Sequence, residues 1–156
     1  ELTVIHEYWE DLRGDSFAPS WREFDLMQLP ASVIPDTHVF DVISPDDGLF
    51  RCRFWGTHVT DLYQQELTGN TIKNLLPENV ANVAYANFKL MLDSKSPTAY
   101  QSNISTRHDR DKLMHVLRVP LSNDGTNVDQ IVTSVTYLQG KRETIKVFNS
   151  MMSLAS

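Results

Sequence analysis

The sequence predicts an α+β fold in which a five-stranded antiparallel sheet carries helices on one face and has an extra N-terminal helix. Two observations lead to this prediction. Strand-like stretches, alternating or rich in β-branched residues, occur twice early and three times late in the chain. Stretches with apolar residues three or four apart lie before and between them. Short turns make consecutive strands neighbours, so the intervening helices must cover one face of the sheet.

The N-terminal part of the chain, residues 1–36, is expected to form a helix followed by an irregular segment. Gly14 is a plausible end for the helix. Its apolar stripe must be buried against another surface, and two alternatives stay open: the free face of the chain's own sheet, or a second copy of the chain in a homodimer. The stripe consists of Val4, Ile5, Tyr8, Trp9 and Leu12.

The first strand pair is predicted over residues 37–44 and 49–56, with a turn rich in Asp and Gly between the strands. In the second strand Phe50, Cys52 and Phe54 alternate with two arginines. This two-residue period is typical of a half-buried strand, and it places the three apolar side chains on the same face.

The helical crossover is expected to begin where this strand stops. Gly56 can adopt backbone angles that other residues avoid, and the hydroxyl of Thr57 is suited to cap the first helix. Helices are predicted over 57–64, 71–76 and 77–93.

Three further strands are predicted over 98–107, 112–121 and 128–138, with a charged hairpin tip between the first two. The strands and the crossover together make residues 37–138 the core of the domain. Residues 139–156 are expected to form a short helix or a tail.

Composition narrows the classes of function. The 156 residues carry a formal net charge of −6, which argues against nucleic acid or an anionic membrane as the main partner. Cys52 is the single cysteine, so no intrachain disulfide can form, and a cytoplasmic location is expected. No apolar run approaches the roughly 20 residues of a membrane span. No signal peptide is visible, although the sequence begins at Glu1.

Several short motifs follow one another in a specific order and resemble those of a PAS-like domain. They match a PAS subfamily found mainly in alphaproteobacteria and long catalogued as a domain of unknown function. The resemblance covers residues 8–138 and departs from the family at Trp55, where relatives prefer an aliphatic residue. The motifs are Tyr8-Trp9-Glu10-Asp11-Leu12-Arg13-Gly14, Pro19 with Trp21-Arg22, Leu29-Pro30, Arg53-Phe54-Trp55-Gly56-Thr57, Leu67-Thr68-Gly69 and Pro120-Leu121-Ser122-Asn123-Asp124-Gly125.

No cofactor, metal or catalytic residue is expected. Cys52 is followed by Arg and Phe, as is the reactive cysteine of flavin-binding PAS relatives, but it lies on a strand and lacks their flanking Asn and Gln. Residues 77–93 contain no His that could bind haem as in other relatives. His38, His58 and His115 do not have the spacing of a metal motif. The sequence therefore predicts a protein that is not an enzyme.

The resemblance implies a sensory or regulatory domain that binds a small apolar or amphipathic molecule, or a protein partner, and signals through its N-terminal helix. The pocket would lie between the sheet and the long helix, where aromatic walls suit such a ligand. Two alternatives stay open: the same side chains simply fill the core, or the domain is a dimerisation scaffold without a ligand. The candidate pocket residues are Phe40, Phe54, Tyr85, Phe88, His115, Leu117 and Tyr137.

Overall fold

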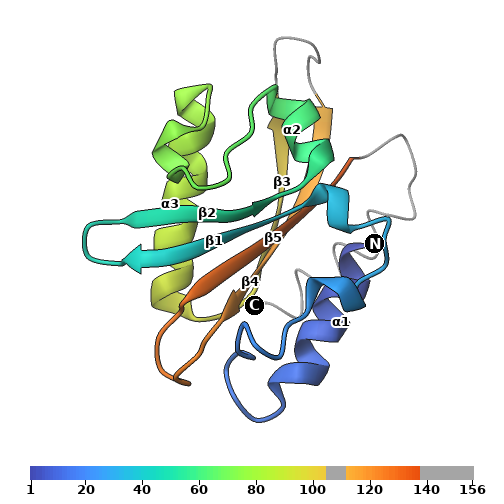
Figure 1. The fold of residues 1–156 in the computed structure, drawn as a ribbon, viewed down its shortest axis with the longest axis vertical. Coiled ribbons are helices and arrows are strands. Elements are labelled where there is room, and N and C mark those ends of the chain that lie inside the picture. Colours follow the sequence, from blue (N-terminus) through green and yellow to red (C-terminus); the bar gives the residue numbers. More distant parts are fainter. Residues whose placement is uncertain (105–111, 138–156) are drawn as a thin grey trace.

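The computed structural model describes residues 1–104 and 112–137 of the chain (Figure 1). Within these ranges five strands form one antiparallel sheet in the order β2-β1-β5-β4-β3, which confirms the predicted fold class. The predicted hairpin tip at 108–111 and the tail at 139–156 lie outside the described residues. The strands are β1 (Thr37–Ser44), β2 (Leu49–Trp55), β3 (Thr98–Ile104), β4 (Lys112–Leu121) and β5 (Gln130–Tyr137).

The helices lie on both sides of this sheet. In Figure 1, β1 and β2 pass in front of α3, whereas α1 lies at the lower right of the sheet. The α-helices are α1 (Leu2–Arg13), α2 (Thr57–Tyr63) and α3 (Glu78–Ser94). Short 3₁₀ turns η1 (Leu26–Gln28), η2 (Ile34–Asp36) and η3 (Ile72–Asn74) complete the described elements.

Strand β2 contains a bulge that changes the predicted alternation. Val39 lies opposite Phe54 and Phe40 opposite Cys52, so Arg53 has no residue facing it on β1. The extra residue turns Phe54 to the α1 side of the sheet. Trp55 instead joins Cys52 in the core on the α3 side. The prediction that Phe54 shares a face with Cys52 is therefore wrong.

The glycine at the end of β2 is needed for close approach. Gly56 has an ordinary φ of −65° and is itself the N-cap of α2, so its predicted special backbone angles and the capping role of Thr57 are wrong. A Cβ atom at this position would lie 2.2 Å from the carbonyl oxygen of Pro35 and 2.7 Å from that of Thr37. The β2–α2 junction therefore packs directly on the backbone that leads into β1.

Helix α1 covers the sheet of its own chain, the first of the two covers considered above. Ile5 and Trp9 are buried in one cluster with Val39, Val119 and Val132 of the sheet. Burial of this apolar surface holds the helix against the sheet, and a hydrogen bond gives further stabilisation. The indole Nε1 of Trp9 donates a hydrogen bond of 2.7 Å to the carbonyl oxygen of Pro120. The rest of the stripe is less covered: Tyr8 and Leu12 are partly buried, and Val4 is 41% exposed.

A second core fills the space between the sheet and α3. Phe40 of β1 and Phe50 of β2 both pack on Phe88 of α3, each with a ring-centroid distance of 5.1 Å. Such offset or edge-on ring contacts add to the burial of apolar area. Beside this core, toward the N-terminal end of α3, the packing leaves a cavity.

Candidate ligand-binding site

A cavity of about 120 Å³ lies between the α3 side of the sheet and the helices that cover it. Its apolar wall consists of Trp55, Ile72, Leu75, Val80, Val83, Ala84, Met114, Val116 and Val135. Its polar lining consists of His38, Tyr63, Asn79, Tyr100, Ser102, Asn103, Arg118 and Thr133. Apolar walls with a few polar groups are typical of small-molecule sites.

Four polar residues stand in one line across the sheet and are called the polar row here. His38 on β1 lies opposite Thr133 on β5, Thr133 opposite Arg118 on β4, and Arg118 opposite Thr98 on β3. The first three line the cavity, and Trp55 extends the same line onto β2. Strand register therefore brings together polar groups that are 15 to 95 residues apart in the sequence.

Each residue of the polar row has a buried polar atom without a hydrogen-bond partner in the part of the chain that the structure describes. These atoms are Nδ1 of His38, Oγ1 of Thr133, Nε of Arg118 and Oγ1 of Thr98. Most buried polar groups in native proteins are hydrogen-bonded. Four such exceptions lie in one line across the sheet, and three of them belong to residues that line the cavity.

Arg118 supplies the positive charge of the site. Its side chain is nearly fully buried, with the residue 4% exposed. Its Nη1 donates a hydrogen bond to the hydroxyl of Tyr100, and its guanidinium lies 5.4 Å from the ring centre of Phe88 and 5.1 Å from that of Tyr100. These contacts hold the cation in place. Within residues 1–104 and 112–137 no carboxylate forms an ion pair with it.

His38 adds no charge to the cavity at neutral pH. Burial, reinforced by the nearby charge of Arg118, lowers its pKa from 6.5 to about 3. Tyr63 stays protonated, because burial raises its pKa well above 10. The cavity thus combines one fixed cation with neutral polar groups.

The seven candidate pocket residues divide between the two faces. Phe40 and Phe88 lie in the core on the α3 side, and Tyr85 packs on Phe50 at a centroid distance of 5.8 Å. Tyr137 is partly buried against a small cluster that includes Met114. These four lie on the expected side of the sheet but fill core beside the cavity without lining it.

The other three candidates lie on the α1 side, so their predicted place in the pocket is wrong. Phe54 and Leu117 pack against the cluster that holds α1. His115 is two residues before Leu117 on the same strand, and its Nε2 lies 2.9 Å from the side-chain nitrogen of Gln101. The bulge displaced Phe54. On β4, side chains alternate between the two faces, and the prediction placed the set that faces α1 in the pocket.

The charge of the site was missed in the sequence, although one signal was present. Arg118 interrupts the otherwise apolar run from Leu113 to Leu121, apart from His115. A lone arginine inside such a run is placed in a buried strand against its usual preference for the surface. Thr133 and Trp55 gave no comparable signal, since β-branched and aromatic residues are common in any strand.

The cysteine and histidines carry no reactive or metal site in the described residues. Cys52 is buried, its Sγ donates to the carbonyl oxygen of Phe54 at 3.3 Å, and burial raises its pKa to about 12. A thiol in this state is unreactive. Among residues 1–104 and 112–137, no three His, Cys, Asp or Glu side chains are grouped so that they could hold a metal ion.

A model of the PAS domain family matches residues 2–136, and the chain belongs to this family. The curated proteins include no match to the sequence. No helix in the described part of the chain is long and apolar enough to cross a membrane.

Solved PAS structures are similar in fold. The PAS domain of BvgS from Bordetella pertussis has a TM-score of 0.55 at 12% identity, covering 77% of this chain and 89% of that one. A LOV protein from Rhodobacter sphaeroides has a TM-score of 0.52 at 10% identity, covering 71% and 63%. A sensory box sensor histidine kinase from Vibrio cholerae has a TM-score of 0.52 at 10% identity, covering 67% and 82%. At such identities the similarity shows the fold alone.

Proposed function

We propose that this chain is a sensory or regulatory PAS domain that binds a small apolar or amphipathic molecule in the cavity between the sheet and α3. PAS domains are typically sensory modules in signal transduction. The observation that carries the proposal is the cavity of about 120 Å³, whose lining includes three residues of the polar row, His38, Thr133 and Arg118, that each have an unpartnered buried polar atom. A ligand that formed hydrogen bonds with the polar side chains of the lining would offset the cost of burying them.

We assign no catalytic reaction to this cavity. Its lining includes a neutral His38 whose Nδ1 is unpartnered, and none of the described lining residues is a nucleophile hydrogen-bonded to a base. An adjacent base is a common means by which proteins activate a side-chain nucleophile. Recognition of a molecule, followed by a change of shape, is the function that the residues support.

The change of shape would reach a partner through α1. The residues next to His38, Thr133 and Arg118 along their strands are Val39, Val132 and Val119. All three valines are buried in the cluster that holds α1. A ligand that shifts the polar row would therefore also shift these valines, which are the side chains on which α1 packs.

The test is native mass spectrometry of freshly purified full chain, followed by thermal unfolding across a panel of metabolites. We expect a bound small molecule, or at least one compound that raises Tm, because a ligand stabilises the state that binds it. A chain that carries no ligand and whose Tm moves with no compound would overturn the proposal.

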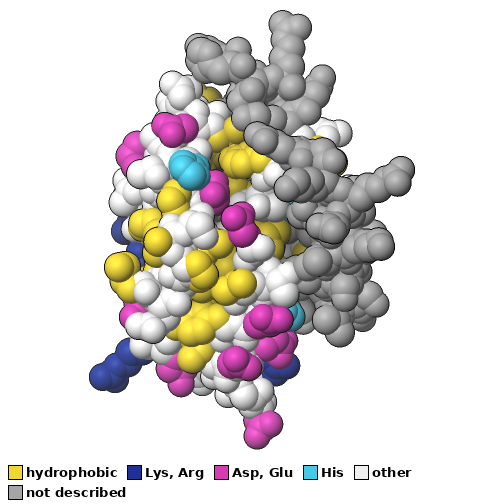
Figure 2. Space-filling view, turned by 90° about the vertical axis from the view of Figure 1, so that its right-hand side faces the viewer, with side chains coloured by type: hydrophobic (Ala, Val, Ile, Leu, Met, Phe, Trp, Pro, Cys, Tyr) yellow, Lys and Arg dark blue, Asp and Glu magenta, His cyan; other side chains and the backbone are white. Residues whose placement is uncertain are grey.

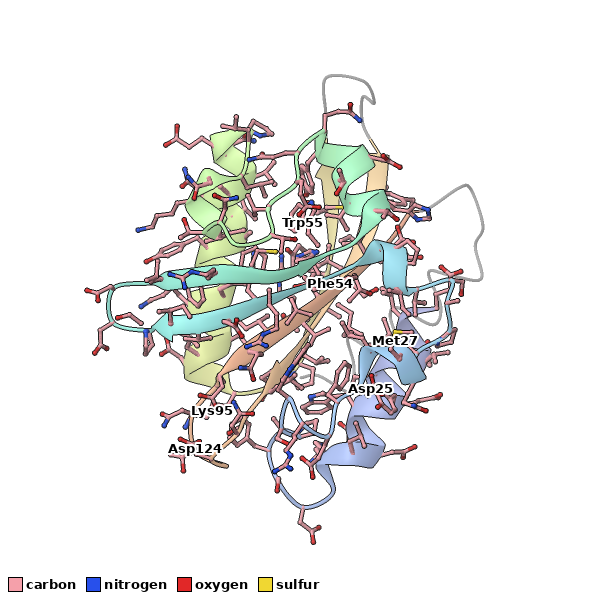
Figure 3. All side chains as sticks on the ribbon, viewed as in Figure 1. Asp25, Met27, Phe54, Trp55, Lys95 and Asp124 are labelled. Carbon is pink, nitrogen blue, oxygen red and sulfur yellow. The ribbon has the colours of Figure 1, made fainter. Side chains whose placement is uncertain are left out.

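A second candidate function is an interaction module that forms a homodimer or docks a partner without a ligand. The observation in its favour is the apolar surface on the α1 side, where Figure 2 shows hydrophobic side chains along the middle of the face. Met27, labelled in Figure 3, is 77% exposed, and Val4 is 41% exposed. Exposed apolar patches mark interaction sites in many proteins.

Light scattering separates the two candidates. A dimeric wild type that becomes monomeric on Met27→Lys with Val4→Ser would support the interaction module. A monomeric wild type would contradict the homodimer. Glu7→Gln is the control, because it raises the net charge by one, as the double variant does, and removes no apolar side chain.

We also propose a cytoplasmic location and membership of the PAS subfamily found mainly in alphaproteobacteria. The free, buried thiol of Cys52 suits a reducing compartment. The ordered motifs from Tyr8 to Gly125 support the subfamily. The net charge of −6 supports partners other than nucleic acid or membrane.

A further inference from the structure

The starting point is the unpaired cation in the polar row. A guanidinium has five N–H donors, and the described contacts of Arg118 use one of them, from Nη1 to Tyr100. Its Nε is buried without an acceptor. Burying a charge is costly unless it is paired, so natural proteins rarely leave an arginine in this state.

None of the described groups that face Arg118 is an anion that could neutralise its charge. Across the strands it faces Thr133 and Thr98, whose hydroxyls are neutral and have no described partner. Its guanidinium also lies over the aromatic rings of Phe88 and Tyr100. The next member of the row, His38, is neutral at physiological pH. The cavity therefore has a net positive charge at its polar wall and apolar side chains elsewhere.

Resting on the proposed function above, we infer that the ligand is a small organic carboxylate, whose carboxylate pairs with Arg118 and whose body fills the apolar part of the cavity. A carboxylate matches the planar fork of a guanidinium and can accept from two of its N–H groups in parallel. The hydroxyl of Thr133, directly opposite on β5, is positioned to donate to the same group.

The size of the cavity limits the body of this ligand. Its volume is about 120 Å³. A cavity of about 150 Å³ in another protein accepts benzene. A single aromatic ring or a short branched chain is therefore the size expected here. Apolar lining such as Met114, Val116 and Val135 favours a hydrocarbon body over a sugar or a second charged group.

The test compares benzoate with benzamide, which has the same shape and no charge. Calorimetric titration of the full-length wild type at pH 7 is expected to give at least tenfold tighter binding of benzoate. Arg118→Gln is expected to weaken benzoate at least tenfold and to change benzamide by less than threefold. Arg51→Gln, the same substitution at an exposed position on β2, is the matched control and should bind both probes as the wild type does.

Two further variants keep the test decisive. Arg118→Lys retains the charge without the fork and should bind benzoate with intermediate affinity. Thr133→Val retains the shape of the side chain and should weaken benzoate more than benzamide. Circular dichroism of each variant reports whether it is folded, and these two replace Arg118→Gln if that variant does not fold.

The outcomes separate this inference from the function on which it rests. If benzamide binds as tightly as benzoate, or if Arg118→Gln leaves benzoate binding unchanged, the carboxylate inference is overturned while the cavity remains a ligand site. If neither probe binds, the carboxylate inference is again overturned. The proposed function then fails as well only if the metabolite panel also produces no rise in Tm.

Discussion

At the scale of single residues, His38 links the stability of the domain to pH. Its folded-state pKa is about 3, whereas an unfolded histidine titrates near 6.5. Between these values the unfolded chain binds a proton that the folded chain does not. The contribution of His38 to stability is therefore fully present above pH 6.5 and is lost as the pH falls toward 3.

We predict that His38→Gln flattens this dependence. Between pH 6 and 4 the free energy of unfolding of the wild type should fall more steeply than that of the variant, by up to about 1.4 kcal/mol per pH unit for one proton. Urea unfolding at several pH values measures both curves. Carboxylates contribute equally to the two proteins, so parallel curves would contradict a buried neutral His38.

Trp55 sets the length of the cavity at the β2 end of the polar row. Its indole is buried, lies 5.0 Å from the ring centre of His38 and donates from Nε1 to the carbonyl oxygen of Gln65 at 2.9 Å. Figure 3 labels it beside Phe54, its neighbour on the opposite face. Truncation at Trp55 should therefore enlarge the cavity, and truncation at Phe54 should not.

We predict that Trp55→Ala reverses the preference between benzoate and the larger 2-naphthoate. The wild type should bind benzoate more tightly, and the variant should bind 2-naphthoate more tightly, as measured by calorimetry. Phe54→Ala is the matched control and should keep the wild-type order with affinities within about twofold, since its side chain lies on the α1 side. A control that also reversed the order would show that the bulge does not separate the two side chains.

At the scale of elements, the β2–α2 junction is fixed by a backbone contact. The Cβ atom of Gly56→Ala would lie 2.2 Å from the carbonyl oxygen of Pro35, and backbone on both sides is held by strand and helix. We predict a loss of about 3 kcal/mol in the free energy of unfolding, from steric overlap alone. Gly125→Ala is the comparison: it has a φ of +74° and open space, so backbone strain should cost about 1 kcal/mol. Equal losses in urea unfolding would argue against the close contact.

Helix α1 depends on one buried side chain for its position. Trp9 is 2% exposed and contacts the sheet, whereas Val4 on the same helix is 41% exposed. We predict that Trp9→Ala lowers the free energy of unfolding by about 3–5 kcal/mol, through lost packing and the lost hydrogen bond to Pro120. Val4→Ala should change it by about 0.5 kcal/mol or less. A small effect of Trp9→Ala would mean that α1 does not cover its own sheet in solution.

Most elements were predictable because their signals are local. The strands at Thr37–Ser44 and Lys112–Leu121 have the predicted bounds, since alternation, β-branching and flanking turns agree there. The bulge at Arg53 was not predictable from alternation, because an extra residue leaves the pattern of Phe50, Cys52 and Phe54 intact in the sequence. The bulge residue is held at the surface by an ion pair of 2.8 Å with Asp41, across the strands.

The candidate site was less predictable than the fold, because it depends on register between distant strands. His38, Thr133 and Arg118 meet only once β1, β5 and β4 are aligned. β1 and β5 are far apart in the sequence, and a loop longer than a tight turn joins β4 to β5, so the sequence pattern does not fix either register to one residue. Aromatic residues were therefore favoured as pocket lining, and the polar row was missed.

At the scale of the whole molecule, the sheet separates a ligand cavity from the helix that would report on it. The polar row lies on the α3 side, and the valines next to it in sequence lie against α1. A sheet of this kind transmits a small displacement because packed cores on both faces resist compression. Occupation of the cavity should therefore change the local stability of α1 without any contact between ligand and helix.

We predict that benzoate alters hydrogen exchange of the amides in Leu2–Arg13. Saturating benzoate should slow exchange across this helix in the wild type, because ligand binding stabilises the sheet on which α1 packs. The same concentration of benzoate should leave α1 exchange unchanged in Arg118→Gln, and benzamide should have a weaker effect in the wild type. Exchange measured by mass spectrometry resolves α1 from α3. Slowing confined to peptides of α3 and the cavity strands would show that ligand binding stops at the sheet, and that α1 is a cover with no part in signalling.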